Sequence, residues 1–285
     1  MLSYYSTNRR VPEVDLAVAL LTGQAADKGL FLPRPLPRMS KEFLARARHL
    51  PYPELAAAIL ETYAEGVFPR EVLREICEEA YDYDVPLEKV DGSSYVMRLD
   101  QGPTASFKDF AARFMGRALG RLVRERGQEL LILTATSGDT GSAIAHAFLG
   151  VPGVRAVVLF PIDEVSDRQR RQMTTLGGNI ATIALDSKFD HCQALVKEAF
   201  ADPNLRDLNL TSANSINIGR LLPQSVYYVY AASRVADVAG GEKVIFSVPS
   251  GNFGDLMGGI LAMKTGRRLS CTNISRRTPL SSPTS

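Results

Sequence analysis

The sequence predicts an α/β protein with an open, mostly parallel sheet that is flanked by helices and preceded by a helical N-terminal unit. Strand-like segments recur at residues 130–136, 154–160, 180–185 and 244–248, and helix-like segments separate them. The first three strand candidates begin about 25 residues apart, which suits right-handed crossovers between parallel strands. A chain of 285 residues, 45% of them hydrophobic, can bury the core that such a sheet requires.

The N-terminal unit, residues 1–80, is predicted to be helical, with an interruption by the prolines of segment 33–37. Apolar residues follow helical spacing in three of its segments: 41–49, 54–65 and 70–81. A long helix is predicted over 107–126, directly before the first strand. We therefore expect a second, α/β region over residues 81–266.

The remaining helices of the α/β region are predicted at 141–149, 166–176, 190–201, 221–238 and 254–264. The Ser-, Asn- and Gly-rich segment 209–219 is predicted to be an ordered loop, a kind of segment that often carries function. Residues 267–285 hold eight Ser or Thr, two Pro and four Arg without apolar periodicity, so we expect an aberrant, disordered tail. An α/β fold would normally continue with another strand at that point, so the C-terminal part of the fold is expected to be missing.

Composition and charge exclude several classes of protein. No segment approaches the roughly 18 consecutive apolar residues of a membrane span, and residues 1–10 lack the apolar core of a signal peptide, so we expect a cytoplasmic protein. The net charge of +2 falls to −2 without the four arginines of the tail, which leaves no basic footprint for nucleic acid. The three cysteines are far apart, which indicates neither a disulfide framework nor a metal site.

The segment 102–109 is the first that could carry chemistry, because it is a turn that enters the helix predicted over 107–126. Its Lys108 is flanked by Phe107 and Phe110 in a chain that uses 25 arginines and only eight lysines. Only lysine forms a Schiff base, and burial lowers the pKa of its amine, so Lys108 is a candidate nucleophile. An ordinary first-turn lysine whose stem lies on apolar surface is the alternative.

Two further segments, 134–142 and 247–255, each lead from a strand through a Gly- and Ser-rich turn into a helix. Such turns bind anions through backbone N–H groups, and the carboxyl ends of parallel strands are where open α/β sheets bind ligands. A plain capped turn is the alternative for the first segment, which lacks the glycine patterns of nucleotide-binding loops. Two anion sites and an amine nucleophile suggest a cofactor with a phosphate and an aldehyde, and pyridoxal phosphate fits this description.

Six motifs, collinear over residues 1 to about 266, resemble the threonine synthase family. They are Tyr4-Tyr5-Ser6-Thr7-Asn8, Ala26-Asp27-Lys28-Gly29-Leu30, Asp100-Gln101-Gly102-Pro103-Thr104-Ala105-Ser106-Phe107-Lys108-Asp109, Ser137-Gly138-Asp139-Thr140-Gly141, Asn214-Ser215-Ile216-Asn217 and Ser250-Gly251-Asn252-Phe253-Gly254-Asp255. The resemblance implies a fold-type II pyridoxal-phosphate enzyme. Its members are lyases that convert O-phospho-L-homoserine and water into L-threonine and phosphate, the last step of threonine biosynthesis.

The resemblance also implies roles for individual residues. Lys108 would hold the cofactor as a Schiff base and then move protons at the substrate carbons. Backbone N–H groups would wrap the cofactor phosphate at Gly251, Asn252, Phe253, Gly254 and Asp255. The expected substrate-binding residues are Ser137, Gly138, Asp139 and Thr140 for the carboxylate, Asn214, Ser215 and Asn217 near the cofactor or the substrate phosphate, and Arg113 and Arg220 for that phosphate. A solvated helix face is the alternative for the two arginines.

Family members continue past the third turn with further sheet, helices and a hydroxyl residue that faces the pyridine nitrogen, and this portion has no counterpart here. Two other readings therefore stay open beside threonine synthase. One is another fold-type II elimination enzyme, similar to serine or threonine dehydratases, and the other is a truncated cofactor-binding remnant without turnover. We expect a small-molecule substrate, no metal, no nucleic-acid or membrane partner, and a monomer or homodimer.

Overall fold

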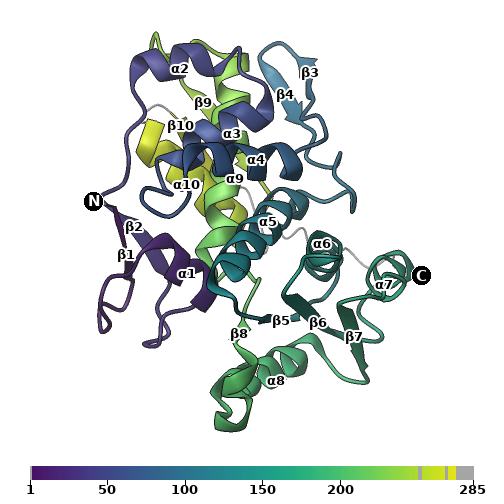
Figure 1. Ribbon diagram of the computed structural model, residues 1–285. Coiled ribbons are helices and arrows are strands. Elements are labelled where there is room, and N and C mark those ends of the chain that lie inside the picture. The colour runs from purple at the N-terminus through teal and green to yellow at the C-terminus, as the bar shows by residue number, and fades with distance from the viewer. Residues whose placement is uncertain (1, 250–251, 267–268, 274–285) are drawn as a thin grey trace, which may run out of the picture.

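A four-stranded parallel sheet forms the base of the computed structural model, which describes residues 2–249, 252–266 and 269–273 (Figure 1). The strand order is β7-β6-β5-β8. The strands are β5 (Leu130–Ala135), β6 (Val154–Pro161), β7 (Ile180–Leu185) and the short β8 (Leu210–Thr211). The predicted parallel sheet is therefore confirmed, and it includes one short strand in a segment that we expected to be a loop.

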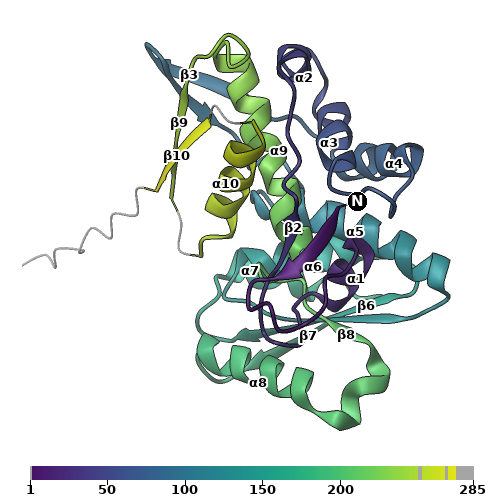
Figure 2. The same ribbon diagram turned by 90° about the vertical axis from the view of Figure 1, so that its left-hand side faces the viewer.

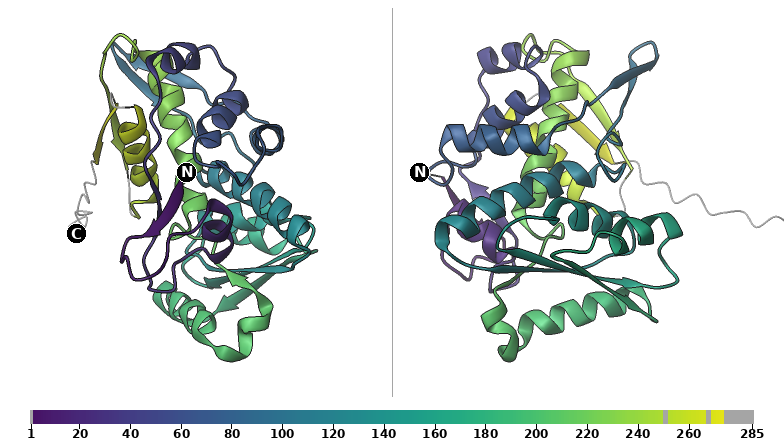
Figure 3. Two further views of the ribbon diagram at one scale, coloured as in Figure 1. Left: turned by 60° about the vertical axis from the view of Figure 1, so that its left-hand side comes forward. Right: turned by 45° about the vertical axis from the view of Figure 1, so that its right-hand side comes forward.

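Helices cover both faces of this sheet. α5 (Lys108–Arg126), α6 (Asp139–Phe148) and α7 (Asp167–Thr174) lie on one face, and α8 (Phe189–Ala201) lies on the other (Figures 1 and 3). A short 3-10 helix, η1 (Pro203–Leu208), links α8 to β8. Because both faces are covered, the central strand β6 reads as a nearly continuous apolar run, as in other buried parallel strands.

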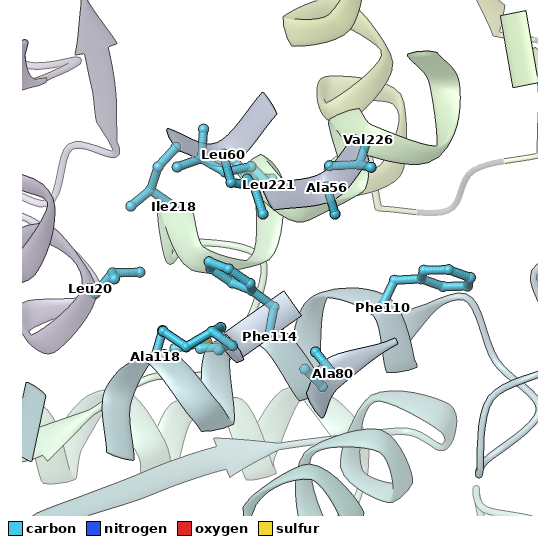
Figure 4. Packing of buried hydrophobic residues seen from close by; sticks show 14 of the residues in the cluster. Leu20, Ala56, Leu60, Ala80, Phe110, Phe114, Ala118, Ile218, Leu221 and Val226 are labelled. Carbon is cyan, nitrogen blue, oxygen red and sulfur yellow. The ribbon is translucent and has the colours of Figure 1, made fainter. Parts of the chain in front are cut away.

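A second long helix, α9 (Ile218–Val235), packs on α5 and links the sheet to the rest of the molecule (Figure 2). Phe114 of α5 faces Ile218 and Leu221 of α9 in the core that Figure 4 shows. α9 begins three residues before the predicted 221 because the Asn217 side chain caps it, accepting a hydrogen bond from the Gly219 N–H at 2.9 Å. α5 carries Lys108 and α9 carries Arg220, two residues of the candidate site.

The N-terminal unit contains the three helices that its periodicity predicts, α2 (Lys41–Ala47), α3 (Tyr52–Glu61) and α4 (Arg70–Ala80), and a further short helix, α1 (Leu16–Thr22). It is not helical throughout, however, because β1 (Ser3–Ser6) and β2 (Phe31–Arg34) form an antiparallel pair. Four-residue strands beside prolines are too short to show a period of two, so the sequence pattern missed them. A hairpin of β3 (Leu87–Asp91) and β4 (Ser94–Met97) then leads toward α5.

A small parallel pair of strands completes the described chain. β9 (Val244–Val248) is followed by α10 (Gly254–Gly266) and by β10 (Leu269–Asn273), which pairs with β9. The expectation of a disordered tail from residue 267 is therefore wrong for Leu269–Asn273, because their backbone continues the crossover that β9 and α10 begin. Residues 267–268 and 274–285 lie outside the described residues. Over the part that is described, no helix combines the length and apolar character needed to cross a membrane.

Candidate active site

A buried carboxylate shapes the turn that precedes Lys108. Asp109 is fully buried and accepts hydrogen bonds from the Thr104 N–H at 2.9 Å and from the Thr104 hydroxyl at 2.7 Å. Gly102 packs directly on this carboxylate, since a Cβ at position 102 would lie 2.6 Å from Asp109 Oδ2. Ala105 adopts a left-handed φ of 54° within the same turn. The chain thereby turns sharply, and Lys108 becomes the first residue of α5.

The Lys108 amine is partly enclosed, with an aromatic ring and a carboxylate as neighbours. Its side chain is 22% exposed, and Nζ lies 4.3 Å from the centre of the Phe107 ring and 3.8 Å from Asp139 Oδ2. Burial lowers the pKa of Lys108 below its ordinary value, and the Asp139 carboxylate partly opposes this effect. A lowered pKa increases the fraction of neutral amine, which is the form that attacks a carbonyl carbon.

The turn of residues 136–141 joins the end of β5 to α6. The Thr136 hydroxyl accepts hydrogen bonds from the Gly138 N–H at 3.0 Å and the Gly141 N–H at 2.9 Å. Gly138 has a φ of 152°, which favours glycine, and Asp139 is the first residue of α6. Ser137 and Asp139 are exposed, and the first N–H groups of a helix have no partner within it. The turn lies beside the Lys108 amine, and its use as an anion cradle stays a prediction.

The third turn is described from residue 252 onward, so the predicted ligand Gly251 lies outside the described residues. Asn252 and Phe253 are exposed, and Gly254 and Asp255 begin α10. The hydroxyls of Tyr227 and Tyr228 donate to Asp255 Oδ1 at 2.6 and 2.7 Å. These bonds hold the first turn of α10 against α9.

The loop that precedes α9 brings only some of its predicted ligands to this region. Ser215 is exposed, and its Cβ would lie 3.1 Å from a Cβ at position 254, so the loop reaches the start of α10. The Asn214 side chain accepts a hydrogen bond from the Thr134 hydroxyl at 2.5 Å. Asn217 is fully buried; its amide donates to the carbonyls of Leu20 and Ser212 while its oxygen caps α9. The Asn217 side chain is therefore used within the fold, which favours this structural role over the expected one near the cofactor or the substrate phosphate.

The two candidate arginines have different surroundings. Arg113 donates to the last carbonyls of α4, those of Glu79 and Ala80, and pairs with Asp82 at 2.8 Å. These contacts engage its guanidinium in fastening α4 to α5, and they favour that role over the expected binding of a substrate phosphate. Arg220, one turn into α9, is 3% exposed and donates from one terminal nitrogen to the Ala213 carbonyl at 2.6 Å.

The solvated-face alternative does not hold for Arg220. Its Nε is buried without a hydrogen-bond partner in the described part of the chain, and burial lowers its pKa to about 10. The charges of Arg220 and of Asp255 act on the pKa of Lys108 in opposite directions, since Arg220 lowers it and Asp255 raises it. Arg220 is thus a buried cation with one donor that has no partner among the described residues.

Sequence reasoning missed four polar side chains that organise the site: Asp109, Gln169, Tyr227 and Tyr228. Asp109 holds the turn before Lys108 by accepting from Thr104, and Tyr227 donates to Asp255 at the start of α10. Gln169, on α7, donates to Asp139 Oδ1 at 2.6 Å. The only sequence signal was for Gln169, since Ser166 three residues earlier makes it the second member of a capping box. No group of three or more His, Cys, Asp or Glu side chains among the described residues is arranged to hold a metal ion.

Comparisons with known proteins agree with this arrangement. Residues 82–276 match the family model of the pyridoxal-phosphate dependent enzymes. The chain belongs to that family. Its N-terminal residues 3–81 match a second model, the threonine synthase N terminus. Pyridoxal phosphate is thus the cofactor of the family, as the pairing of a candidate amine with anion-binding turns predicted.

Individual threonine synthases are similar to this member of the pyridoxal-phosphate dependent enzymes. It is 40% identical to the threonine synthase of Escherichia coli and 41% identical to that of Haemophilus influenzae, each over 98% of this chain and 65% of the relative. The solved Escherichia coli enzyme superposes with a TM-score of 0.87 over 96% of this chain and 63% of that chain, at 40% identity. The chain therefore has the fold of the solved threonine synthases and spans about 65% of the length of these relatives.

A structure of threonine synthase from Brucella melitensis, described as bound to pyridoxal phosphate, superposes with a TM-score of 0.87 at 37% identity, over 93% of this chain and 58% of that chain. The residues described here suit the same group. Lys108 supplies a partly buried amine, and the N-terminal turn of α10 supplies backbone N–H groups that suit a phosphate. The free Nε of Arg220 supplies a further donor for an anion.

Proposed function

We propose that this chain binds pyridoxal phosphate through Lys108 and acts as a threonine synthase on O-phospho-L-homoserine and water, releasing L-threonine and phosphate. The observation that carries the proposal is the position of one partly enclosed lysine amine, whose Nζ lies 3.8 Å from the Asp139 carboxylate in the first turn of α6. The bound cofactor would supply an electron sink that makes the protons on the neighbouring substrate carbons acidic.

Lys108 would have two tasks. Its amine would anchor the cofactor covalently, and when free it would take and return protons at the substrate carbons. The lowered pKa of Lys108 supports both tasks, because the neutral amine is the nucleophile and the base. The Asp139 carboxylate, 3.8 Å from Nζ, would stabilise the protonated form in the intervals between these transfers.

Two helix N-termini would hold the anionic groups. The backbone N–H groups of residues 252–255, together with those of Gly251, would bind the cofactor phosphate, with the α10 dipole behind them. The turn of Ser137, Gly138, Asp139 and Thr140 would bind the substrate carboxylate. Because the Asp139 carboxylate is already hydrogen-bonded by Gln169, this turn would bind through its backbone rather than through that side chain.

Arg220 would neutralise the substrate phosphate. Its buried Nε has no hydrogen-bond partner in the described chain, so an oxyanion could satisfy it without breaking an existing contact. Asn214 and Ser215 lie on the loop that leads to α9 and would contribute polar groups beside it. The N-terminal match to threonine synthases supports this substrate over those of dehydratase-like enzymes.

The test is phosphate release and threonine formation from O-phospho-L-homoserine by the chain loaded with pyridoxal phosphate. We expect turnover that is lost in Lys108→Ala and kept in the matched control Lys188→Ala, whose side chain is 86% exposed. Phosphate release that survives Lys108→Ala would contradict the proposal. Lys108-dependent cofactor binding without turnover would leave the cofactor-binding remnant as the correct reading.

The same proposal includes a cytoplasmic location and a monomeric or homodimeric state. Sedimentation of the purified chain with pyridoxal phosphate measures the second of these directly. A mass above that of two chains would contradict it.

A further inference from the structure

One carboxylate links Lys108 to a residue outside the motifs of the site. Asp139 Oδ2 faces Lys108 Nζ at 3.8 Å, while its other oxygen, Oδ1, accepts a hydrogen bond from Gln169 Nε2 at 2.6 Å. The Asp139 side chain is 49% exposed, so water competes for both oxygens. Gln169 is the side chain that fixes one of them in a defined direction.

Gln169 is itself held firmly by its neighbours. It lies in the first turn of α7, where its Oε1 accepts hydrogen bonds from the Ser166 N–H at 3.1 Å and the Ser166 hydroxyl at 2.9 Å. Its backbone carbonyl accepts from the Ser142 hydroxyl of α6 at 3.3 Å. It also packs on Gly138, where a Cβ would lie 2.5 Å from Gln169 Nε2. The oxygen of its side-chain amide is therefore bound by Ser166 in the cap of α7, while the nitrogen donates to Asp139.

We propose that Gln169 is a positioning residue that holds the Asp139 carboxylate against the Lys108 amine, so that the protonated amine keeps a counter-charge beside it. This rests on the proposed function only in taking Lys108 as the reacting lysine. Without the Gln169 donor, the half-exposed Asp139 side chain would turn to water, since an exposed ion pair alone does not compensate the rotamer entropy lost in holding it.

The electrostatic consequence has a definite sign. The charged groups that act on Lys108 are Asp139 from α6, Arg220 from α9, Asp255 from α10 and Asp109 from its own helix. Asp139 is the largest of the influences that raise the pKa of Lys108. Loss of that contact should lower the pKa of the amine further, because burial and Arg220 both act in that direction.

The test follows acetylation of Lys108 by limiting acetic anhydride in the cofactor-free chain, read on its peptide by mass spectrometry over a pH series from about 6 to about 11. Gln169→Met and Asp139→Asn should each move the profile to lower pH, by about half a unit to one unit. The double variant should move it no further than Asp139→Asn alone, because Gln169 acts through Asp139. Thr174→Ala is the matched control, since it removes an exposed, uncharged side chain of the same helix whose hydroxyl donates to the Arg170 carbonyl, and its profile should stay in place.

An unshifted profile in Gln169→Met would overturn the proposal, and so would a Gln169→Met shift that persists in full in the Asp139→Asn background. If Gln169→Met does not fold, Gln169→Ala takes its place, because it also removes the donor to Asp139, and an unmoved profile there overturns the proposal in the same way. No pyridoxal phosphate is added, so these outcomes are independent of whether the chain binds the cofactor or turns over substrate.

Discussion

Replacement of Asp109 by Ala should destabilise the chain and disturb the turn that presents Lys108. The carboxylate is fully buried and accepts two hydrogen bonds from Thr104, at 2.9 and 2.7 Å. Each bond to a charged acceptor contributes about 1.5–3 kcal/mol, and the change would leave a buried N–H without a partner. Part of this loss is offset because a carboxylate no longer has to be desolvated, so we expect the free energy of unfolding to fall by about 2–4 kcal/mol.

The assay is urea unfolding of the cofactor-free chain, with two graded controls. Asp109→Asn keeps a carbonyl acceptor for the Thr104 N–H and an amide that can donate to the hydroxyl, so its loss should be about 1 kcal/mol. Thr104→Val removes only the hydroxyl bond and should cost about 1–1.5 kcal/mol. If the free energy of unfolding of Asp109→Ala lies within about 0.5 kcal/mol of that of the parent chain, the buried carboxylate does not hold this turn and the reasoning fails.

Three other predictions concern pH, strain and substrate binding. The pKa of Lys108 is lower in the folded chain than in the unfolded one, where it is near 10.5, so the unfolded state binds more protons between the two values. The free energy of unfolding of the cofactor-free chain should therefore rise with pH across that window, and Lys108→Met should flatten the slope. An unchanged slope in that variant would contradict the lowered pKa of Lys108. Gly138→Ala combines a φ of 152° with a Cβ that would lie 2.5 Å from Gln169 Nε2, so it should lower stability by about 1–3 kcal/mol. Gly66→Ala should cost less, because φ is 76° there and no atom would lie within 4 Å of the Cβ. Equal losses in a thermal melt would contradict the close approach of Gln169 to Gly138. Arg220→Ala should raise KM for O-phospho-L-homoserine about tenfold or more, whereas Arg113→Ala should lower stability and leave KM unchanged; equal KM values would remove Arg220 from the site.

Much of the fold followed from periodicity, and the failures have a common cause. The long helices and the three longer strands of the main sheet carry enough residues for their spacing to show, as α5 and β6 illustrate. The pair β1 and β2 and the strand β10 contain only four or five residues each. Their pairing is decided by neighbours far along the chain, which a local pattern does not contain.

The site shows the same division. Lys108 and the turn at 137–140 were predictable because each lies at a helix start that local turn residues define. The roles of Arg113 and Asn217 were not, because their side chains bind backbone carbonyls of α4 and α1, at Ala80 and Leu20. Polar residues beside a motif resemble ligands in sequence until the tertiary contacts that use them are seen.

The most direct test of the central claim is to trap the cofactor on the chain. The full chain is incubated with pyridoxal phosphate, reduced with borohydride and mapped by peptide mass spectrometry across its eight lysines. The account predicts one reduced pyridoxyl group, on Lys108, in nearly every molecule. Label spread over exposed lysines such as Lys188, or absent from Lys108, would contradict it.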